Sequence, residues 1–172
     1  MPAPHTHPRC ILCHRAGKQS CSGCGTQYCS DECRDTGQHA HEILCSSLSK
    51  FNTAPPVPDA KRRWTFRRSI LFPADADKPQ FFWLKCSPVK PYEFNDAKDY
   101  LESVQHRIAV RDNEARGKTF NHTIEIMYGA GSAHGGSLMN KSIAAATGSS
   151  ADEHGWRGNV IVMRHEGPGQ EL

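Results

Sequence analysis

The sequence contains no long apolar run. No stretch of its 172 residues approaches the roughly 18–20 consecutive apolar residues needed to cross a bilayer, so no membrane-spanning segment is expected. The first eight residues also lack the basic and apolar regions of a secretory signal. A cytoplasmic or nuclear protein is therefore expected, and in those compartments cysteines stay reduced or bind metal instead of forming structural disulfides.

No sign of charge dominates the sequence. Lys and Arg number 21 against 18 Asp and Glu, which gives a formal net charge of +3 when each thiol is counted as neutral. The length fits one or two small domains, and a large multidomain enzyme is not expected. Apolar residues make up 37% of the chain, enough for part of it to bury a core.

Large aliphatic side chains are scarce between residues 10 and 45, where only Ile11, Leu12, Ile43 and Leu44 occur. The same segment holds seven of the eight cysteines. So few apolar side chains cannot offset the entropy lost when a segment of this size is ordered, and such segments usually depend on a metal or a disulfide. Residues 10–45 are therefore predicted to form a small domain held together by metal.

Cysteine and histidine residues in this segment form four closely spaced pairs. Structural zinc takes four Cys or His ligands tetrahedrally, so eight ligands fill two closed sites. Unconnected thiols and an iron–sulfur cluster are the alternatives, but the evenly spaced pairs favour two zinc ions. The predicted metal ligands are Cys10, Cys13, Cys21, Cys24, Cys29, Cys33, His41 and Cys45.

Local sequence signals support this choice of ligands. Ser30 before two acidic residues is typical of a helix N-cap, which would place Cys33 on the first turn, facing back towards the preceding cysteine. His41 and Cys45 are four residues apart and would share one face of a helix. His39 competes as the eighth ligand, but it lies six positions before Cys45, more than one helical turn, so His41 is preferred.

The run Cys-x2-Cys-x7-Cys-x2-Cys-x4-Cys-x3-Cys-x7-His-x3-Cys resembles a MYND-type zinc finger. The resemblance implies a small cross-brace finger, made of a short hairpin and short helices, with interleaved sites. Spacing alone fits a sequential arrangement equally well. In the interleaved arrangement one zinc ion is held by Cys10, Cys13, Cys29 and Cys33, and the other by Cys21, Cys24, His41 and Cys45.

The same resemblance implies that the finger recognises short, extended, proline-containing peptides and that the chain is an adaptor or regulatory protein. A rigid hairpin suits a partner that is already extended. This chain departs from the family at two positions that help to form the peptide groove: Arg34 stands where Gln is common, and Gln38 where Trp is common. A finger that only supports the rest of the chain is the alternative.

Residues 46–60 are rich in Ser, Asn and Pro and are predicted to form a semi-extended linker. The next segment, Lys61 to Arg68, has five basic residues and two aromatic ones. It could contact nucleic acid, as in a nuclear transcriptional regulator, or direct nuclear import. The preferred interpretation is the solvated start of a strand whose Trp64 and Phe66 pack inward, because one short basic run is not an extended patch.

Residues 61–172 are predicted to form a small α+β domain. Apolar patterning predicts strands at 69–72, 80–86, 122–128 and 159–163, and helices at 95–111 and 140–147. This region is similar to the companion region of MYND proteins from filamentous fungi, a likeness that names no activity. Those chains continue beyond the position of Gly169, so the region is expected to be short at its C-terminus.

No catalytic residue is predicted, and the chain is not expected to be an enzyme. The pair Asn121 and His122 faintly resembles a motif of SET-type lysine methyltransferases, some of which carry this finger, but no cofactor-binding Gly-x-Gly segment precedes the finger. The Gly-rich loop at 129–137 matches neither a dinucleotide nor a phosphate-binding motif. Cys86 is expected at a strand end, outside the metal sites.

Zinc ligation changes the distribution of charge. Residues 1–45 contain four basic and four acidic residues, so seven thiolates and two divalent ions would bring this part to −3. The rest of the chain, with 17 basic and 14 acidic residues, stays at +3. The balance argues against general nucleic-acid binding and restricts any such contact to residues 61–68.

Overall fold

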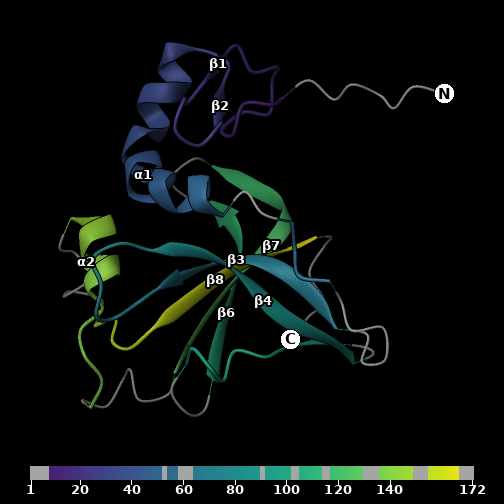
Figure 1. The fold of residues 1–172 in the computed structure, drawn as a ribbon, viewed down its shortest axis with the longest axis vertical. Helices are drawn as coiled ribbons and strands as arrows, with labels where there is room; N and C mark the ends of the chain where they lie inside the picture. Colours follow the sequence, from purple (N-terminus) through teal and green to yellow (C-terminus); the bar gives the residue numbers. More distant parts are fainter. Residues whose placement is uncertain are drawn as a thin grey trace. The chain divides into compact units, whose positions relative to one another are not determined.

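The computed structural model describes residues 8–51, 54–57, 64–89, 92–101, 105–113, 117–129, 136–148 and 155–166. The chain divides into two compact units, Met1–Asn52 and Thr53–Leu172 (Figure 1). The division falls inside the range 46–60 that the sequence predicts as a linker. Each unit has its own secondary structure and is described separately below.

The first unit consists of a two-stranded antiparallel hairpin and one long helix. Strand β1 spans Gln19–Ser20, strand β2 spans Gln27–Tyr28, and the helix α1 spans Asp31–Lys50. The hairpin is as predicted, but the several short helices expected are a single helix of 20 residues. The first five residues of the predicted linker are therefore the last turn of α1, which corrects the boundary at residue 46.

The composition of the last turn explains why α1 continues past Cys45. No proline occurs between Pro8 and Pro55, so no residue within α1 removes a backbone donor or blocks the helix. The hydroxyl of Ser49 donates to the carbonyl of Ser46 at 2.9 Å, so this serine satisfies its own hydrogen-bonding group within the helix. The backbone N–H of Phe51 closes the helix on the carbonyls of Ser47 and Leu48.

Gly37 lies buried in the middle of α1, where the helix passes close to the rest of the unit. A Cβ at this position would lie 3.3 Å from Leu12 Cδ1 and 3.3 Å from Tyr28 Cε1. The absent side chain lets the helix lie against the loop and the hairpin. This close approach compensates for the lower helix propensity of glycine.

The described residues of the second unit form a six-stranded antiparallel sheet and one short helix. The strand order is β5-β4-β3-β8-β7-β6. Helix α2 spans Lys141–Thr147. The strands are β3 (Thr65–Phe72), β4 (Gln80–Val89), β5 (Tyr92–Asn95), β6 (Gln105–Asn113), β7 (Lys118–Gly129) and β8 (Val160–Glu166).

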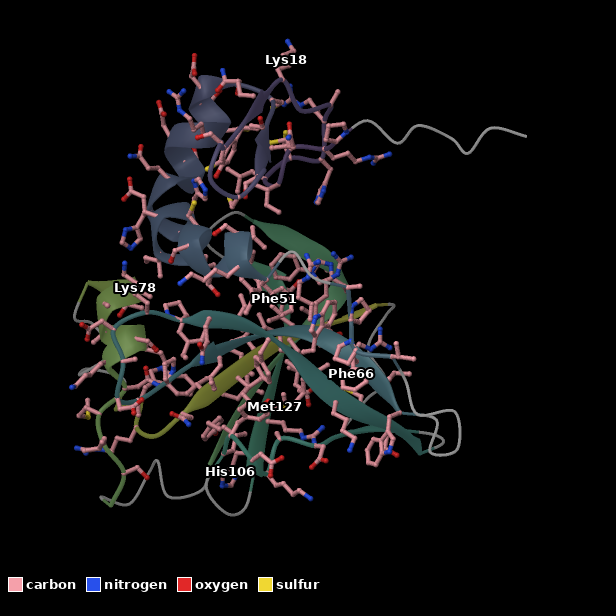
Figure 2. The ribbon with its side chains drawn as sticks, in the orientation of Figure 1. Lys18, Phe51, Phe66, Lys78, His106 and Met127 are labelled. Atoms are coloured by element: carbon pink, nitrogen blue, oxygen red, sulfur yellow. The ribbon has the colours of Figure 1, made fainter. Side chains whose placement is uncertain are left out.

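One face of this sheet carries the core of the second unit. Met127, labelled in Figure 2, is fully buried at its centre. The turn that follows β5 contributes the buried side chains of Ala97 and Leu101. The core cluster consists of Leu71, Leu84, Cys86, Ala97, Leu101, Met127, Ile161 and Met163.

Most of the predicted elements are present in the structure: the strands at 69–72, 80–86, 122–128 and 159–163 and the helix at 140–147. The helix predicted at 95–111 is wrong. Residues 98–100 form a turn and Gln105–Asn113 forms β6. Ile108 and Val110 suit a pleated surface, and pairing along β7, with a bulge between Val110 and Asp112, outweighs the helical spacing of apolar residues.

Asn140 anchors α2 to the sheet. It is almost fully buried, and its side-chain amide donates to the carbonyls of Phe72 at 2.9 Å and Gly158 at 2.7 Å. Its carbonyl oxygen accepts from the backbone N–H of Ile143 and from the hydroxyl of Ser142, so it also caps the helix. All hydrogen-bonding atoms of this side chain are thus used.

We expect Asn140→Ala to lower the free energy of unfolding by at least about 2 kcal/mol, because it removes the cap and leaves buried backbone groups without their partner. Urea unfolding followed by tryptophan fluorescence measures the loss. Thr147→Ala, at the exposed end of the same helix, is the control and should change stability by less than about 0.5 kcal/mol. Equal effects of the two variants would contradict the anchoring role.

The two helices in the described part of the chain differ in length and in setting. Helix α1 carries exposed acidic residues in its first turn, Asp31 and Glu32, and α2 is only seven residues long.

Among the described residues, no helix is long and apolar enough to cross a membrane.

Candidate metal centres

Two similar turns present the first four cysteines. In each Cys-x2-Cys turn, the residue after the second cysteine has a left-handed backbone: His14 with φ 61° and Gly25 with φ 76°. The N–H of each returns to the carbonyl of the first cysteine, at 2.9 Å for Cys10 and 2.8 Å for Cys21. These closed turns direct both thiols of a pair to the same side, as chelation of one ion requires.

Helix α1 presents three further ligands. The side chain of Ser30 accepts a hydrogen bond from the backbone N–H of Cys33 at 3.3 Å, which confirms the predicted N-cap and places Cys33 on the first turn. His41 and Cys45 follow on later turns, four residues apart and on one helical face. Cys29, between the hairpin and the helix, completes the set.

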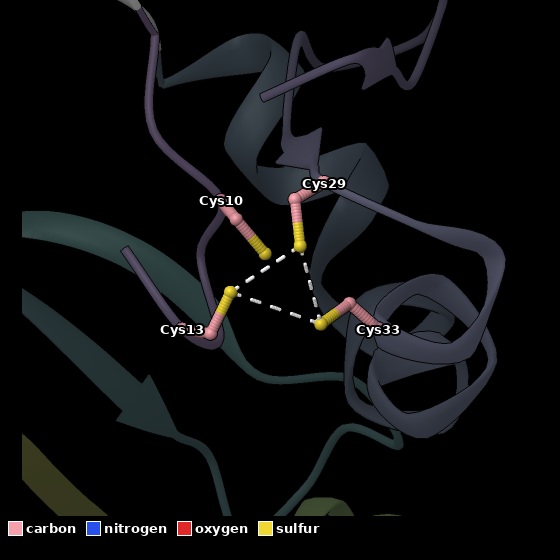
Figure 3. Close-up of side chains that lie close together, drawn as sticks. All are labelled: Cys10, Cys13, Cys29 and Cys33. Carbon is pink, nitrogen blue, oxygen red and sulfur yellow. Dashed lines mark hydrogen bonds between the residues drawn. The ribbon is translucent and has the colours of Figure 1, made fainter. Parts of the chain in front are cut away.

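The first group joins one turn to the start of the helix. The Sγ atom of Cys13 lies 3.3 Å from that of Cys29 and 3.9 Å from that of Cys33, and Cys29 and Cys33 are 3.6 Å apart. Figure 3 shows these thiols and that of Cys10 converging on one point. All four Sγ atoms lie within 4.8 Å of one another, and Cys10 is fully buried.

The second group joins the other turn to the middle of the helix. Cys21 Sγ lies 3.7 Å from Cys45 Sγ, and Cys24 Sγ lies 3.3 Å from His41 Nε2. The four ligand atoms again lie within 4.8 Å of one another. The His41 ring meets the buried Tyr28 ring edge-on, with centroids 5.9 Å apart, so the hairpin helps to orient this imidazole.

The geometry of both groups fits tetrahedral zinc. With Zn–S bonds of about 2.3 Å, ideal tetrahedral ligands have sulfur atoms about 3.8 Å apart, and a sulfur and an imidazole nitrogen lie about 3.6 Å apart. The separations given above agree with these values within roughly half an ångström. Four thiolates, or three thiolates and one imidazole, are also the donor sets that structural zinc takes.

Backbone donors make one thiol of each group acidic. Burial raises the pKa of the Cys10 thiol, but backbone N–H groups, that of Cys13 foremost, outweigh burial and lower the pKa to about 6. The backbone N–H of Cys24 acts most strongly on Cys21 and lowers its pKa to about 6. Each Cys-x2-Cys turn therefore stabilises a thiolate before any ion binds.

The thiols from the helix are shifted in the opposite direction. Hydrogen bonding with the Cys29 thiol raises the pKa of Cys33 to about 12, and hydrogen bonding with Cys21 raises that of Cys45 to about 11. The crowded sulfur atoms, four in the first group and three in the second, cannot all carry a negative charge unless a cation lies between them. A divalent ion supplies that charge, so each group is chemically suited to a metal.

The structure brings all eight predicted ligands together in two groups and leaves the competing His39 outside them. His39, on α1, and His14 belong to neither group. Cys86 also lies outside both, as predicted, but it is fully buried within β4 and not at a strand end, because β4 continues to Val89.

The residues considered for other activities occupy different positions. Asn121 and His122 lie within β7, where the His122 ring stacks on that of Phe120 with centroids 5.1 Å apart. Most of the Gly-rich loop, residues 130–135, and residues 61–63 of the basic cluster lie outside the described residues. Arg67 and Arg68 belong to β3, so the predicted strand at the basic cluster is confirmed. The predicted inward packing is wrong for Phe66, which pairs with Lys85 on the face opposite the core residues Leu71 and Leu84 and is half-buried.

Comparison with known proteins finds no relative of this chain. No family model, curated protein or solved structure matches the chain.

We expect purified protein to contain two zinc ions per chain, and elemental analysis measures this number. His41→Ala should reduce the count to one or none, because three ligands no longer close the second site and the unit depends on its zinc to fold. His39→Ala, two residues earlier on the same helix, is the matched control and should leave the count at two. One ion in the parent chain, iron instead of zinc, or equal losses in the two variants would contradict the assignment.

Proposed function

We propose that residues 10–45 are a MYND-type finger that holds two structural zinc ions and serves as a protein-interaction module. The observation that carries this proposal is the interleaving of the two ligand groups. The first and third cysteine pairs meet in one group, and the second pair meets His41 and Cys45 in the other. Such crossed linkage would fix the hairpin against the helix, as a cross-brace finger requires.

The ion would have a structural role at each centre. Four protein ligands leave no coordination position for water or a substrate, in contrast to catalytic zinc sites. The charge supplied by zinc would stabilise the thiolates, while Ser30, the left-handed turns and helix α1 hold the ligands in place. We therefore propose an adaptor or regulatory protein and not an enzyme.

The hairpin offers an edge to an extended partner. Among the described residues, β1 pairs only with β2, so the outer edge of β1 has backbone groups that a peptide strand can bind. A proline-containing segment is already extended and loses little entropy on binding. These properties support a short, proline-containing peptide as the partner.

Polar contacts cover the surface between β1 and the start of α1. Gln19 Nε2 donates to Asp31 at 3.1 Å, and Arg34 forms ion pairs with Asp31 at 3.0 Å and Asp35 at 3.3 Å. Gln38, where the family commonly has Trp, donates to Glu42 at 2.7 Å. A peptide bound to this surface would contact hydrogen-bonding and charged groups. We therefore expect the residues that flank its extended, proline-containing segment to be polar.

Selection from a library of displayed peptides tests this function with the zinc-loaded full chain. We expect proline-containing peptides to be enriched, and Arg34→Ala to lower their affinity about 3- to 10-fold, as for a contributing but exposed interface residue. Lys50→Ala, about 24 Å away at the other end of α1, is the control. If the zinc-loaded chain enriches no peptide, the proposal is contradicted and the finger only supports the rest of the chain.

A further inference from the structure

One face of the sheet in the second unit alternates aromatic and cationic side chains. The register of β3 and β4 pairs Phe66 with Lys85 and Arg68 with Trp83, and directly paired residues lie on the same face. Lys85 Nζ lies 3.8 Å from the centre of the Trp64 ring, and Arg68 Cζ lies 5.8 Å from that of Trp83. Phe66, on β3, is labelled in Figure 2.

Strand β8 extends this face. Ile70 pairs with Phe81 on β4 and with Val162 on β8, so these residues share the face with Arg68. Arg164, two residues after Val162, returns to the same side and is exposed. The aromatic–cationic face is defined here as Trp64, Phe66, Arg68, Phe81, Trp83, Lys85 and Arg164.

The charged side chains that the structure describes on this face of β3, β4 and β8 are cations, and one of them, Lys85, has a carboxylate nearby. Among the side chains that the structure describes on this side of β3, β4 and β8, none is a carboxylate. Asp96, which follows β5, places a carboxylate oxygen 3.9 Å from Lys85 Nζ. Arg68 and Arg164 are exposed, and the rings of Trp64, Phe66 and Trp83 are half-buried.

We propose that the aromatic–cationic face binds single-stranded nucleic acid. Cations on three neighbouring strands can contact successive phosphates, and the aromatic rings can stack on unpaired bases, a combination that is typical of proteins that bind single strands. An apolar protein surface would remove the water that solvates the exposed side chains of Arg68 and Arg164. An acidic protein would supply charge but no bases to stack.

The folded sheet brings together cationic residues that are far apart in the sequence. A single basic run at residues 61–68 is too short to form an extended patch, but the fold adds Lys85 and Arg164 from distant parts of the chain. The proposal concerns the second unit alone, so it does not depend on zinc or peptide binding by the finger.

Fluorescence anisotropy of labelled 12-nucleotide oligo-dT and oligo-U, with the full chain, tests the proposal. Arg68→Gln and Lys85→Gln should each weaken binding several-fold and reduce the slope of log K against log salt by about 0.7, the value for one lost phosphate contact. Arg67→Gln is the matched control, since Arg67 pairs with Leu84 and faces the opposite side of the sheet. Lys78→Gln, in the exposed turn between β3 and β4, is a second control.

Stacking is tested separately from charge. Trp83→Leu should weaken binding about 5-fold or more, and Trp83→Phe, which keeps a ring, should recover much of that loss. Circular dichroism shows whether each variant is folded, and Lys85→Gln carries the test if a change at Trp83 disturbs the sheet. Neither variant should alter the zinc content.

Three results would overturn the proposal. The first is the absence of binding to both oligonucleotides at low salt. The second is an equal loss for Arg67→Gln and Arg68→Gln, which would indicate attraction by general charge. The third is displacement of the oligonucleotide by polyglutamate at equal charge concentration, which would indicate an acidic protein as the partner.

Discussion

Removing zinc, or replacing Cys24 or Cys45 by alanine, is expected to unfold the first unit completely. Among its described residues, Cys10 and Tyr28 are the only buried apolar side chains, so hydrophobic burial contributes little to its stability. Binding of structural zinc to small fingers contributes about 10–16 kcal/mol at neutral pH. This exceeds the stability that the few buried side chains could provide, so folding of this unit should require the metal.

The positions of the tryptophans allow the two units to be followed separately. Trp64, Trp83 and Trp156 all belong to the second unit. A chelator should abolish the helical circular dichroism of α1 and leave the tryptophan fluorescence and its urea midpoint unchanged. Retention of the α1 signal after chelation would contradict the role of zinc in folding, and a simultaneous loss of the tryptophan signal would show that the units unfold together.

The ligands could be predicted from the sequence because their chemistry is local. Two cysteines separated by two residues must form a tight turn to chelate one ion, and a serine cap fixes the start of α1 within a few residues. The grouping of the sites is not local. Spacing alone fits a sequential arrangement, and only the fold brings Cys13 to Cys29 and Cys21 to Cys45.

The second unit was harder to predict because pairing between distant strands decides its structure. Ala97, Leu101 and Ile108 share a helical spacing, but two of them are buried in a turn and the third lies on β6. No local pattern shows that Lys85 and Arg68 belong to one face, or that Arg107 will meet Glu125. These contacts depend on strand order, which a single sequence does not specify.

The buried ion pair between Arg107 and Glu125 is expected to dominate the electrostatic stability of the second unit. Arg107 Nη1 lies 3.0 Å from Glu125 Oε1, and the exposed fractions of the two side chains are 24% and 3%. Glu125 lies on the central part of β7, between Ala109 on β6 and Met163 on β8. Its carboxylate is thus enclosed by the sheet and depends strongly on the guanidinium.

Arg107→Met should lower the free energy of unfolding by about 3–5 kcal/mol, because it removes the guanidinium and leaves a buried negative charge. Urea unfolding followed by tryptophan fluorescence measures the loss. The variant that combines Arg107→Met with Glu125→Met should recover most of the stability, because no charge then remains to be desolvated. The pair would behave as a weak surface ion pair if Arg107→Met cost less than about 1 kcal/mol. Failure of the double variant to recover would instead assign the loss to packing of the Arg107 side chain.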